Sequence, residues 1–133
     1  MVFVDTSAFF AWYVRRDSLH QIAVKRFRDI EDSRLITTNH VVEETLTLIA
    51  RKVSYSFAGV IAERFYAPNP IDIVHTDRVD ESAAITFFRK FSDQRVGFTD
   101  CISFAIMRRT GISTAFTFDR HFVDAGFKII GLE

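Results

Sequence analysis

Short apolar runs alternate along this chain with longer segments in which apolar residues recur every three to four positions. The short runs are rich in β-branched and aromatic residues, which favours strands, whereas the longer segments have helical periodicity. This alternation is typical of βαβ units around a parallel sheet. The predicted strands lie at residues 2–4, 35–38, 71–74, 115–118 and 128–130.

The predicted helices are bounded by residues that commonly start or stop helices. Thr6 and Ser7 can cap the helix after the first strand, Asn39 is a plausible cap for another, and Gly111 follows two arginines as at a helix C-terminus. One helix is expected directly after the first strand, and another between Ser54 and the prolines at 68–70. The other predicted helices lie at residues 18–32, 41–53, 77–91, 99–109 and 121–125. We therefore predict one α/β domain, residues 1–133, folded as a three-layer α/β/α sandwich with four to five parallel strands.

Composition agrees with an ordinary globular domain. Of the 133 residues, 48% are hydrophobic and 26% are charged. No apolar run approaches the roughly 20 residues of a membrane span, and the N-terminus lacks the features of a signal peptide. The single cysteine, Cys101, excludes an internal disulfide and is interpreted as a small core residue. A cytoplasmic location without membrane contact is expected.

Most of the fifteen phenylalanines are interpreted as core residues rather than as platforms for nucleic-acid bases. Their spacing supports this, as in Phe87, Phe88 and Phe91 or in Phe116 and Phe118. Ile22 is likewise placed on the apolar side of its helix.

Acidic residues occur at unusual places in the pattern. Asp5 and Asp119 close predicted strands, Asp100 opens an apolar helix, and the pair Glu43-Glu44 lies inside another. A carboxylate beside a core must be solvated, paired or bound to a cation, because burying it bare is costly. Strand ends of a parallel sheet form a ligand crevice where the strand order reverses, so Asp5 and Asp119 would meet there if their strands are neighbours.

A cluster of such acids would need a hard divalent cation, as in a metal-dependent nuclease. Zero net charge argues against binding nucleic acid by bulk charge alone, but a local basic rim remains compatible with it. The candidate rim residues are Arg15, Arg16, Arg51, Lys52, Arg95, Arg108, Arg109 and Arg120.

Taken together, these segments resemble PIN-domain ribonucleases, specifically the toxins of VapBC toxin–antitoxin pairs. The resemblance is strongest over residues 98–109, at Gly111-Ile112, over 115–122 and at Gly126-Phe127, and it extends over essentially the whole chain. Residues 4–7 match the position of the family's first acid, and Glu44-Thr45-Leu46 matches its second. Gly97 departs from the pattern, because many relatives have a serine there.

The resemblance implies a sheet in the order 3-2-1-4-5 and an endoribonuclease that uses Mg²⁺ or Mn²⁺. It implies that Asp5, Glu44, Asp100 and Asp119 line one catalytic site. Asp5 and Asp100 are expected to bind the metal directly, and Asp119 to bind a second ion or orient water. Glu44 is expected to act through water or as a general base. Partners implied are an RNA substrate, a VapB-like antitoxin and a second copy in a homodimer.

Several alternatives remain open. A catalytically silent PIN-like module that binds RNA or another protein is one, and a housekeeping RNA-processing nuclease without an antitoxin is another. A haloacid-dehalogenase-type phosphatase is disfavoured because Ser7 stands where its second aspartate belongs. A receiver domain is disfavoured because its early acidic pair and late lysine are missing. All four histidines are assigned surface or structural roles, and Thr6 and Thr99 are considered as contacts to water at the metal.

Overall fold

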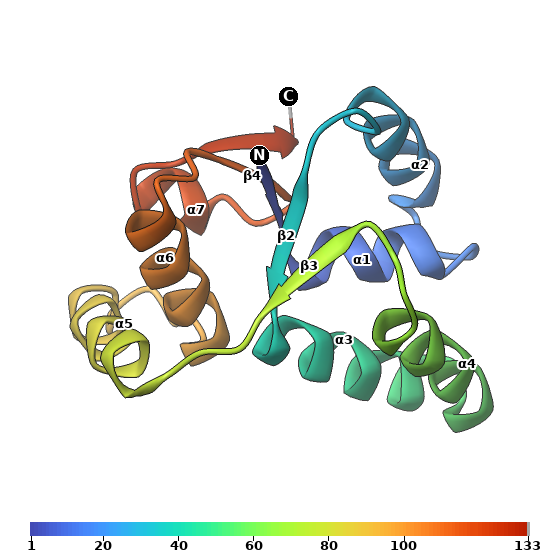
Figure 1. Cartoon of the computed structure of the whole chain (residues 1–133), viewed down its shortest axis with the longest axis horizontal. Helices are drawn as coiled ribbons and strands as arrows, with labels where there is room; N and C mark the ends of the chain where they lie inside the picture. Colours follow the sequence, from blue (N-terminus) through green and yellow to red (C-terminus); the bar gives the residue numbers. More distant parts are fainter. Residues whose placement is uncertain (133) are drawn as a thin grey trace.

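All strands of the sheet in the computed structural model are parallel, and they lie in the order β3-β2-β1-β4-β5 (Figure 1). Residues 1–132 are described; the predicted domain runs on to Glu133, which lies outside the described residues. The strands are β1 (Val2–Val4), β2 (Leu35–Thr38), β3 (Ile71–Val74), β4 (Thr114–Thr117) and β5 (Lys128–Gly131). The predicted strand order is confirmed, with five strands within the described residues.

Helices lie in two groups on either side of this sheet. In Figure 1, α1 to α4 lie to one side of the central strands and α5 to α7 to the other, which gives the three layers predicted from the sequence. The helices are α1 (Thr6–Tyr13), α2 (His20–Asp29), α3 (Asn39–Lys52), α4 (Tyr55–Tyr66), α5 (Arg78–Lys90), α6 (Phe98–Thr110) and α7 (His121–Asp124).

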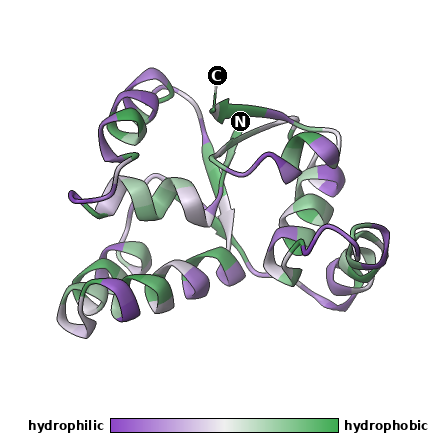
Figure 2. Cartoon of the chain, turned by 180° about the vertical axis from the view of Figure 1, so that it is seen from behind, coloured by the Kyte–Doolittle hydropathy of each residue, from purple (hydrophilic) through white to green (hydrophobic). Residues whose placement is uncertain are grey.

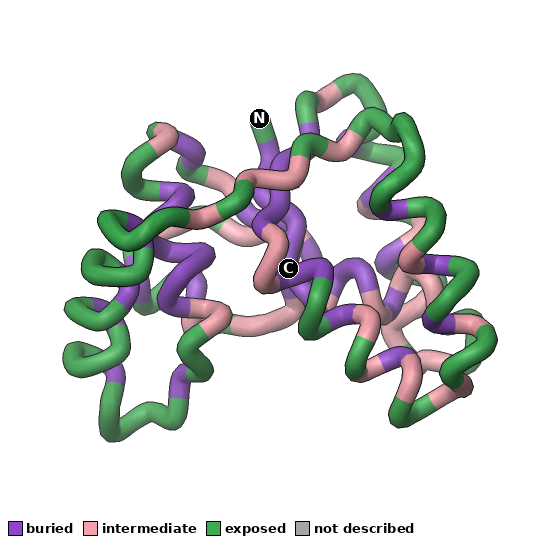
Figure 3. Tube along the Cα trace, turned by 60° about the horizontal axis from the view of Figure 1, so that its bottom comes forward, coloured by how far each residue is buried: buried purple, intermediate pink, exposed green. Residues whose placement is uncertain are grey.

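The sheet and the inner helix faces form the core. Figure 2 shows the strands as mainly hydrophobic, and Figure 3 shows burial concentrated there while the outer helices are largely exposed. The bulkiest wholly buried side chains are phenylalanines, namely Phe3, Phe9, Phe104, Phe116 and Phe122. Helix α6 is buried from Cys101 through Met107, so the cysteine is a core residue as predicted.

Some predicted core positions are wrong. Phe88 and Ile22 are exposed, on the outer faces of α5 and α2, although Phe87 and Phe91 are buried. Phe88 instead packs edge-on against the exposed Phe98, with ring centroids 5.4 Å apart. Consecutive residues of a helix point about 100° apart, so on α5, which is buried on one face only, Phe87 faces the core and Phe88 faces outwards.

The predicted helix caps also need correction. Neither Thr6 nor Ser7 caps α1, whose N-cap is Asp5 without a side-chain hydrogen bond. Thr38, not Asn39, caps α3 by accepting from the backbone N–H of Val41 at 3.1 Å. The Asn39 side chain instead accepts from the backbone N–H of Thr76, joining α3 to the segment after β3. By contrast, Gly111 does end α6, in the left-handed conformation.

No helix within residues 1–132 is long and apolar enough to cross a membrane.

Candidate active site

The carboxyl ends of β1 and β4 bring the first two acids together. Strand β1 lies between β2 and β4, so the strand order reverses on either side of it. Phe3 pairs with Ala115 and Val4 with Phe116, and the backbone N–H of Asp5 donates to the carbonyl of Phe116 at 3.0 Å. Asp5 and Thr117 are therefore level at the end of the sheet, and Asp119 follows two residues later. The meeting of Asp5 and Asp119 at a switch point is confirmed.

Asp5 is the most buried of the four acids, with only 2% of its surface exposed. Its Oδ2 accepts hydrogen bonds from the hydroxyls of Thr117 at 2.8 Å and Ser7 at 3.0 Å. Its Oδ1 is equally buried but has no hydrogen-bond partner within the described residues. A buried carboxylate oxygen without a donor is costly, so this atom is suited to a cation or a bound water.

Ser7 and Thr117 also hold the chain around Asp5 in place. The Ser7 hydroxyl lies 3.2 Å from that of Thr117 and accepts from the backbone N–H of Phe118 at 2.9 Å. The Thr117 hydroxyl accepts from the backbone N–H of Asp119 at 3.0 Å. Because the N–H of Phe118 bonds to Ser7, β4 ends at Thr117 and not at Phe118 as predicted.

Asp119 is fixed by a histidine that the sequence did not place in the site. Its Oδ1 accepts from the backbone N–H of His121 at 2.9 Å and lies 2.8 Å from the ring Nδ1 of the same residue. Of the surface or structural roles expected for the histidines, His121 therefore has a structural one, because it orients Asp119. Among the described residues, no such bond is made to the other oxygen of Asp119.

Electrostatics tie the four acids into one group. Burial, together with the nearby charge of Asp119, raises the pKa of Asp5 to about 6 even though the bonds from Thr117 and Ser7 lower it. Burial, and after it the charges of Asp5, Asp119 and Glu44, together raise the pKa of Asp100 to about 8. Such mutual repulsion requires that the side chains lie near one another.

Helix α6 supplies Asp100 from its first turn. The N-cap is Gly97, with no side-chain cap, and a bond with the backbone of Gly97 partly offsets the rise in the pKa of Asp100. A Cβ at residue 97 would lie 3.7 Å from Oδ2 of Asp100, in ordinary contact. A serine side chain in relatives would thus point towards this carboxylate, and its absence leaves the carboxylate itself in place.

Glu43 and Glu44 both lie exposed on α3, in a groove of about 310 Å³. Of the two, Glu44 is the one whose charge acts on Asp100. The groove also contains Thr99, His40 and Arg51, so it runs from the acids along α3.

The candidate rim residues have different environments. Arg109 is bound by Asp80, and Arg108 lies over the ring of Phe87 at 4.6 Å. Arg51 lies in the groove beside Glu44, whereas Arg15 and Arg16 line a separate cavity at the far end of α1. Thr6 does not cap α1, and its buried Oγ1 has no partner within residues 1–132.

The donor set suits a hard cation, although it is not preassembled as a cluster of ligands. Within residues 1–132 no group of three or more His, Cys, Asp or Glu side chains already has the arrangement of a cation site. The available atoms are nevertheless carboxylate oxygens. One of them, on Asp5, is buried without a partner among the described residues, and burial together with nearby carboxylates raises the pKa values of Asp5 and Asp100. Oxygen-only ligands of this kind suit Mg²⁺ and Mn²⁺.

A parallel sheet in the order 3-2-1-4-5 with acids at its switch point defines the class of the fold, which is α/β and PIN-like. Comparison with known families agrees, since the model of the PIN domain matches residues 2–128. The chain belongs to the PIN-domain family.

Curated relatives place it more closely. The chain is 34% identical over 127 residues to the 23S rRNA-specific endonuclease VapC20 of Mycobacterium tuberculosis, covering 96% of this chain and 95% of that protein. It is 31% identical over 104 residues to a VapC ribonuclease of Archaeoglobus fulgidus, covering 75% of this chain and 65% of that protein. Within the family, the chain is a VapC-type ribonuclease toxin.

Solved structures support the same grouping. The crystal structure of M. tuberculosis VapC20, described as a sarcin–ricin loop cleaving toxin, superposes with a TM-score of 0.88 at 31% identity, covering 99% of this chain and 98% of that one. FitAcB from Neisseria gonorrhoeae superposes with a TM-score of 0.73 at 15% identity, covering 98% and 96% of the two chains. At that identity the second likeness concerns the fold alone.

Proposed function

We propose that this protein is a divalent-metal-dependent endoribonuclease in which Asp5, Glu44, Asp100 and Asp119 form the catalytic site. The observation that carries the proposal is the position of these acids at the switch point of the sheet, where the Thr117 hydroxyl donates to Asp5 and accepts from the backbone N–H of Asp119. The charges of Asp5, Asp119 and Glu44 also contribute to the raised pKa of Asp100. Carboxylates that repel one another in the folded protein lose that repulsion when a divalent cation lies among them.

Asp5, Asp100 and Asp119 are the residues that would hold Mg²⁺ or Mn²⁺. Asp5 is fixed by Ser7 and Thr117, which leaves its Oδ1 free as a ligand. Asp119 is fixed through Oδ1 by His121 and can use its other oxygen. Asp100 would complete the set. When bound, such a cation supplies positive charge at the scissile phosphate and increases the acidity of a neighbouring water.

Glu44 is the general base in this scheme. It lies exposed at the edge of the acid group, in the groove of about 310 Å³ that also contains Thr99 and Arg51. From there its carboxylate can orient a water and accept a proton from it as the water attacks phosphorus. Arg51, in the same groove, would contact a phosphate next to the scissile one.

The RNA substrate we infer is ribosomal. M. tuberculosis VapC20 is a 23S rRNA-specific endonuclease, and its structure is described as that of a sarcin–ricin loop cleaving toxin. The likeness extends over almost the full length of both chains, which supports a similar substrate here. We accordingly place the protein in the cytoplasm, where ribosomes are present. The test is to incubate purified ribosomes with the protein, and 23S rRNA that stays uncleaved at every position would contradict this substrate.

A VapB-like antitoxin and a homodimer complete the proposal. A solved relative is the DNA-bound VapBC of Salmonella typhimurium, whose likeness at 13% identity and a TM-score of 0.70 concerns the fold. An Arg or Lys of the antitoxin, inserted among the four acids, would replace the charge of the metal. Sedimentation tests the dimer, and co-purification with the product of an adjacent gene tests the antitoxin. A monomer at all micromolar concentrations would exclude the dimer.

The test is cleavage of a sarcin–ricin loop RNA with Mn²⁺, with excess chelator, and by an Asp100→Asn variant. We expect cleavage only when Mn²⁺ is present. The Asp100→Asn variant should cleave about 100-fold more slowly or worse, because losing a metal ligand costs at least as much activity as losing a residue that hydrogen-bonds to one. Asp93→Asn, at an exposed aspartate shortly before α6, is the matched control and should retain activity. Calorimetry with Mn²⁺ must show weaker binding to Asp100→Asn than to Asp93→Asn. Undiminished cleavage in chelator would contradict the metal mechanism.

A silent RNA-binding module is the second candidate. It predicts RNA binding without cleavage in the same assay. All four acids of the proposed catalytic site, Asp5, Glu44, Asp100 and Asp119, are present in this chain, which supports the enzyme over this alternative.

A further inference from the structure

A cavity of the molecule lies away from the acids, at the C-terminal end of α1. It has a volume of about 610 Å³, within the range of roughly 300–1,000 Å³ that is usual for ligand pockets. Helices α1, α2 and α4 contribute to its wall, together with the segment that follows α1. None of the roles assigned above uses this cavity.

The charged side chains that line the cavity are all positive. Arg15, Arg16 and Arg64 line it, and no Asp or Glu is among the lining residues. All three arginines are exposed, and within residues 1–132 no carboxylate forms an ion pair with any of them. By contrast, Arg34 and Arg109 are paired with Asp72 and Asp80. Three unpaired guanidinium groups around one cavity favour an anionic occupant, and their planar donors suit phosphate.

Aromatic side chains form another part of the wall. Trp12, Tyr13 and Phe57 line the cavity, and all three are half-buried. The ring of Trp12 is held in place by Phe27 and Tyr13, with centroids 4.2 and 4.9 Å away. Rigid aromatic surface beside cations is the combination that binds a nucleotide, because the base packs on the rings while the phosphate meets the arginines.

The distance to the acids is that of a short length of RNA. Asp5 immediately precedes α1, and Tyr13 is its last residue, so the two ends of the helix are about 12 Å apart. An RNA strand with its scissile phosphate at the acids can therefore reach the cavity within a few nucleotides. The acid group itself repels RNA, so the attraction that holds the substrate must come from cations elsewhere.

We propose that this cavity, which we call the α1 pocket, binds a nucleotide of the RNA substrate at a few nucleotides from the cleaved bond. Arg15, Arg16 and Arg64 contact its phosphates, and Trp12 with Tyr13 contacts its base. The inference rests on the proposed ribonuclease function for its choice of ligand. An acidic peptide is the competing occupant, and the presence of a catalytic centre for phosphodiesters on the same helix favours RNA over it.

The sequence provides a built-in reporter, because Trp12 is the only tryptophan of the chain. The experiment titrates wild-type protein in excess EDTA with a short single-stranded oligoadenylate and follows tryptophan fluorescence. The expected result is saturable quenching in the absence of divalent metal. An Arg16→Ala/Arg64→Ala variant should bind about tenfold more weakly or worse, and the dependence of log K on log salt should become shallower by about 0.7 for each lost phosphate contact.

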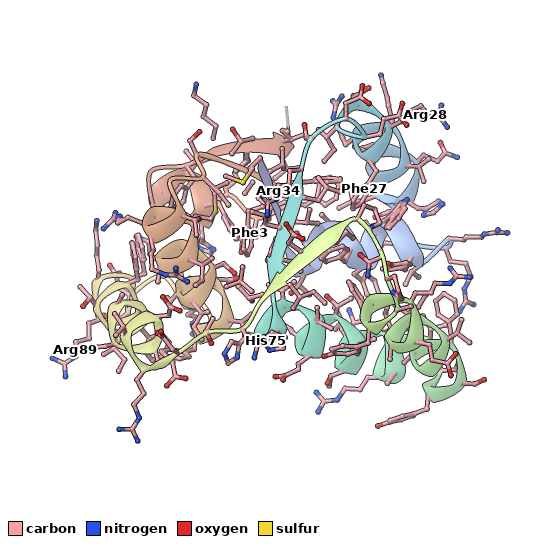
Figure 4. All side chains as sticks on the ribbon, in the orientation of Figure 1. Phe3, Phe27, Arg28, Arg34, His75 and Arg89 are labelled. Atoms are coloured by element: carbon pink, nitrogen blue, oxygen red, sulfur yellow. The ribbon has the colours of Figure 1, made fainter. Side chains whose placement is uncertain are left out.

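The matched control is an Arg28→Ala/Arg89→Ala variant. Figure 4 labels these two arginines, on α2 and α5, and neither lines the pocket. The control variant removes the same charge and should bind within about twofold of wild type, whereas bulk attraction would weaken both variants equally. Equal weakening, or no weakening in either variant, would overturn the proposal, as would tighter binding of an oligoglutamate peptide than of oligoadenylate in the same pocket.

Failure of the proposed function has a different signature. Quenching that depends on Arg16 and Arg64, together with no cleavage in Mn²⁺, would keep the α1 pocket as an RNA site and remove the enzyme. Cleavage in Mn²⁺ together with unchanged RNA binding by the Arg16→Ala/Arg64→Ala variant would keep the enzyme and exclude the α1 pocket as an RNA site.

Discussion

Asp5 illustrates at the scale of single residues how a carboxylate is kept at the edge of a core. Two hydroxyls bind one of its oxygens, and its main chain continues the sheet through a bond to Phe116. The second oxygen is buried, and none of residues 1–132 donates a hydrogen bond to it. The free energy lost by burying that atom is recovered only when a ligand binds, so the residue is suited to binding rather than to stability.

Glu43 and Glu44 provide the sharpest residue-scale prediction, because both are exposed neighbours in the same groove. Glu44, unlike Glu43, is among the charges that raise the pKa of Asp100. We therefore expect Glu44→Gln to lower cleavage by about two orders of magnitude, the scale of a lost general base. Glu43→Gln should stay within a few-fold of wild type. Cleavage rates of both folded variants at saturating Mn²⁺ decide the matter. An inactive Glu43→Gln beside an active Glu44→Gln would reverse the assignment.

At the scale of elements, α5 and α6 are joined by an ion pair between opposite helix ends. Asp80, in the first turn of α5, accepts from Nε and Nη2 of Arg109 in the last turn of α6, at 2.7 and 3.3 Å. Asp80 also completes a capping box by accepting from the backbone N–H of Asp77. Both charges are favourable for their helix dipoles, so this contact sets how the helix carrying Asp100 packs.

We therefore expect Asp80→Ala to lower the free energy of unfolding by about 2 kcal/mol, because Asp80 is only 3% exposed and loses several bonds. The expected loss is no larger because half of the Arg109 side chain is exposed, and solvent screens its attraction to Asp80. The comparison is Asp72→Ala, which breaks the pair of Arg34 and Asp72 at the same 2.7 Å but on the surface, and should cost about 0.5 kcal/mol or less. Urea unfolding measures both, and equal losses would contradict the argument.

For the whole molecule, the acid group sets how stability depends on pH. The folded protein binds protons at Asp5 and Asp100 more tightly than the unfolded chain, because their pKa values are raised from 3.8 to about 6 and about 8. This contribution to stability is complete below about pH 4 and is lost as pH rises through the folded values. Removing the charge of Asp100 should therefore stabilise the protein at alkaline pH.

We expect wild-type protein in EDTA to lose stability between pH 5 and pH 8.5. Asp100→Asn should be more stable than wild type by about 1 kcal/mol or more at the upper end, and indistinguishable from it below about pH 4. Mn²⁺ should raise the unfolding temperature of wild type at the upper end more than that of the variant. Thermal unfolding followed by circular dichroism provides the measurement. Parallel pH profiles for the two proteins would show that the acids do not repel one another as described.

The sequence by itself determined the alternation of strands and helices, because hydrophobic period is a local property. It also placed Asp5 and Asp119 at strand ends and Asp100 at a helix start, and the resemblance of its segments supplied the strand order. What local pattern could not supply was the direction of each side chain. Phe88 and Ile22 look like core residues along the chain but lie on outer faces, and Thr6 and Ser7 look like caps although neither caps α1.

Only the tertiary structure decided which groups surround the acids. Ser7 and Thr117 lie 110 residues apart and meet because β1 and β4 are paired in one register. Within local sequence, the hydroxyl two residues before Asp119 and the histidine two residues after it were visible signals, but nothing local set them apart from ordinary turn residues. The α1 pocket is likewise formed by α1, α2 and α4 together. Contacts between distant segments depend on how helices pack on the sheet, and that packing is a property of the whole chain.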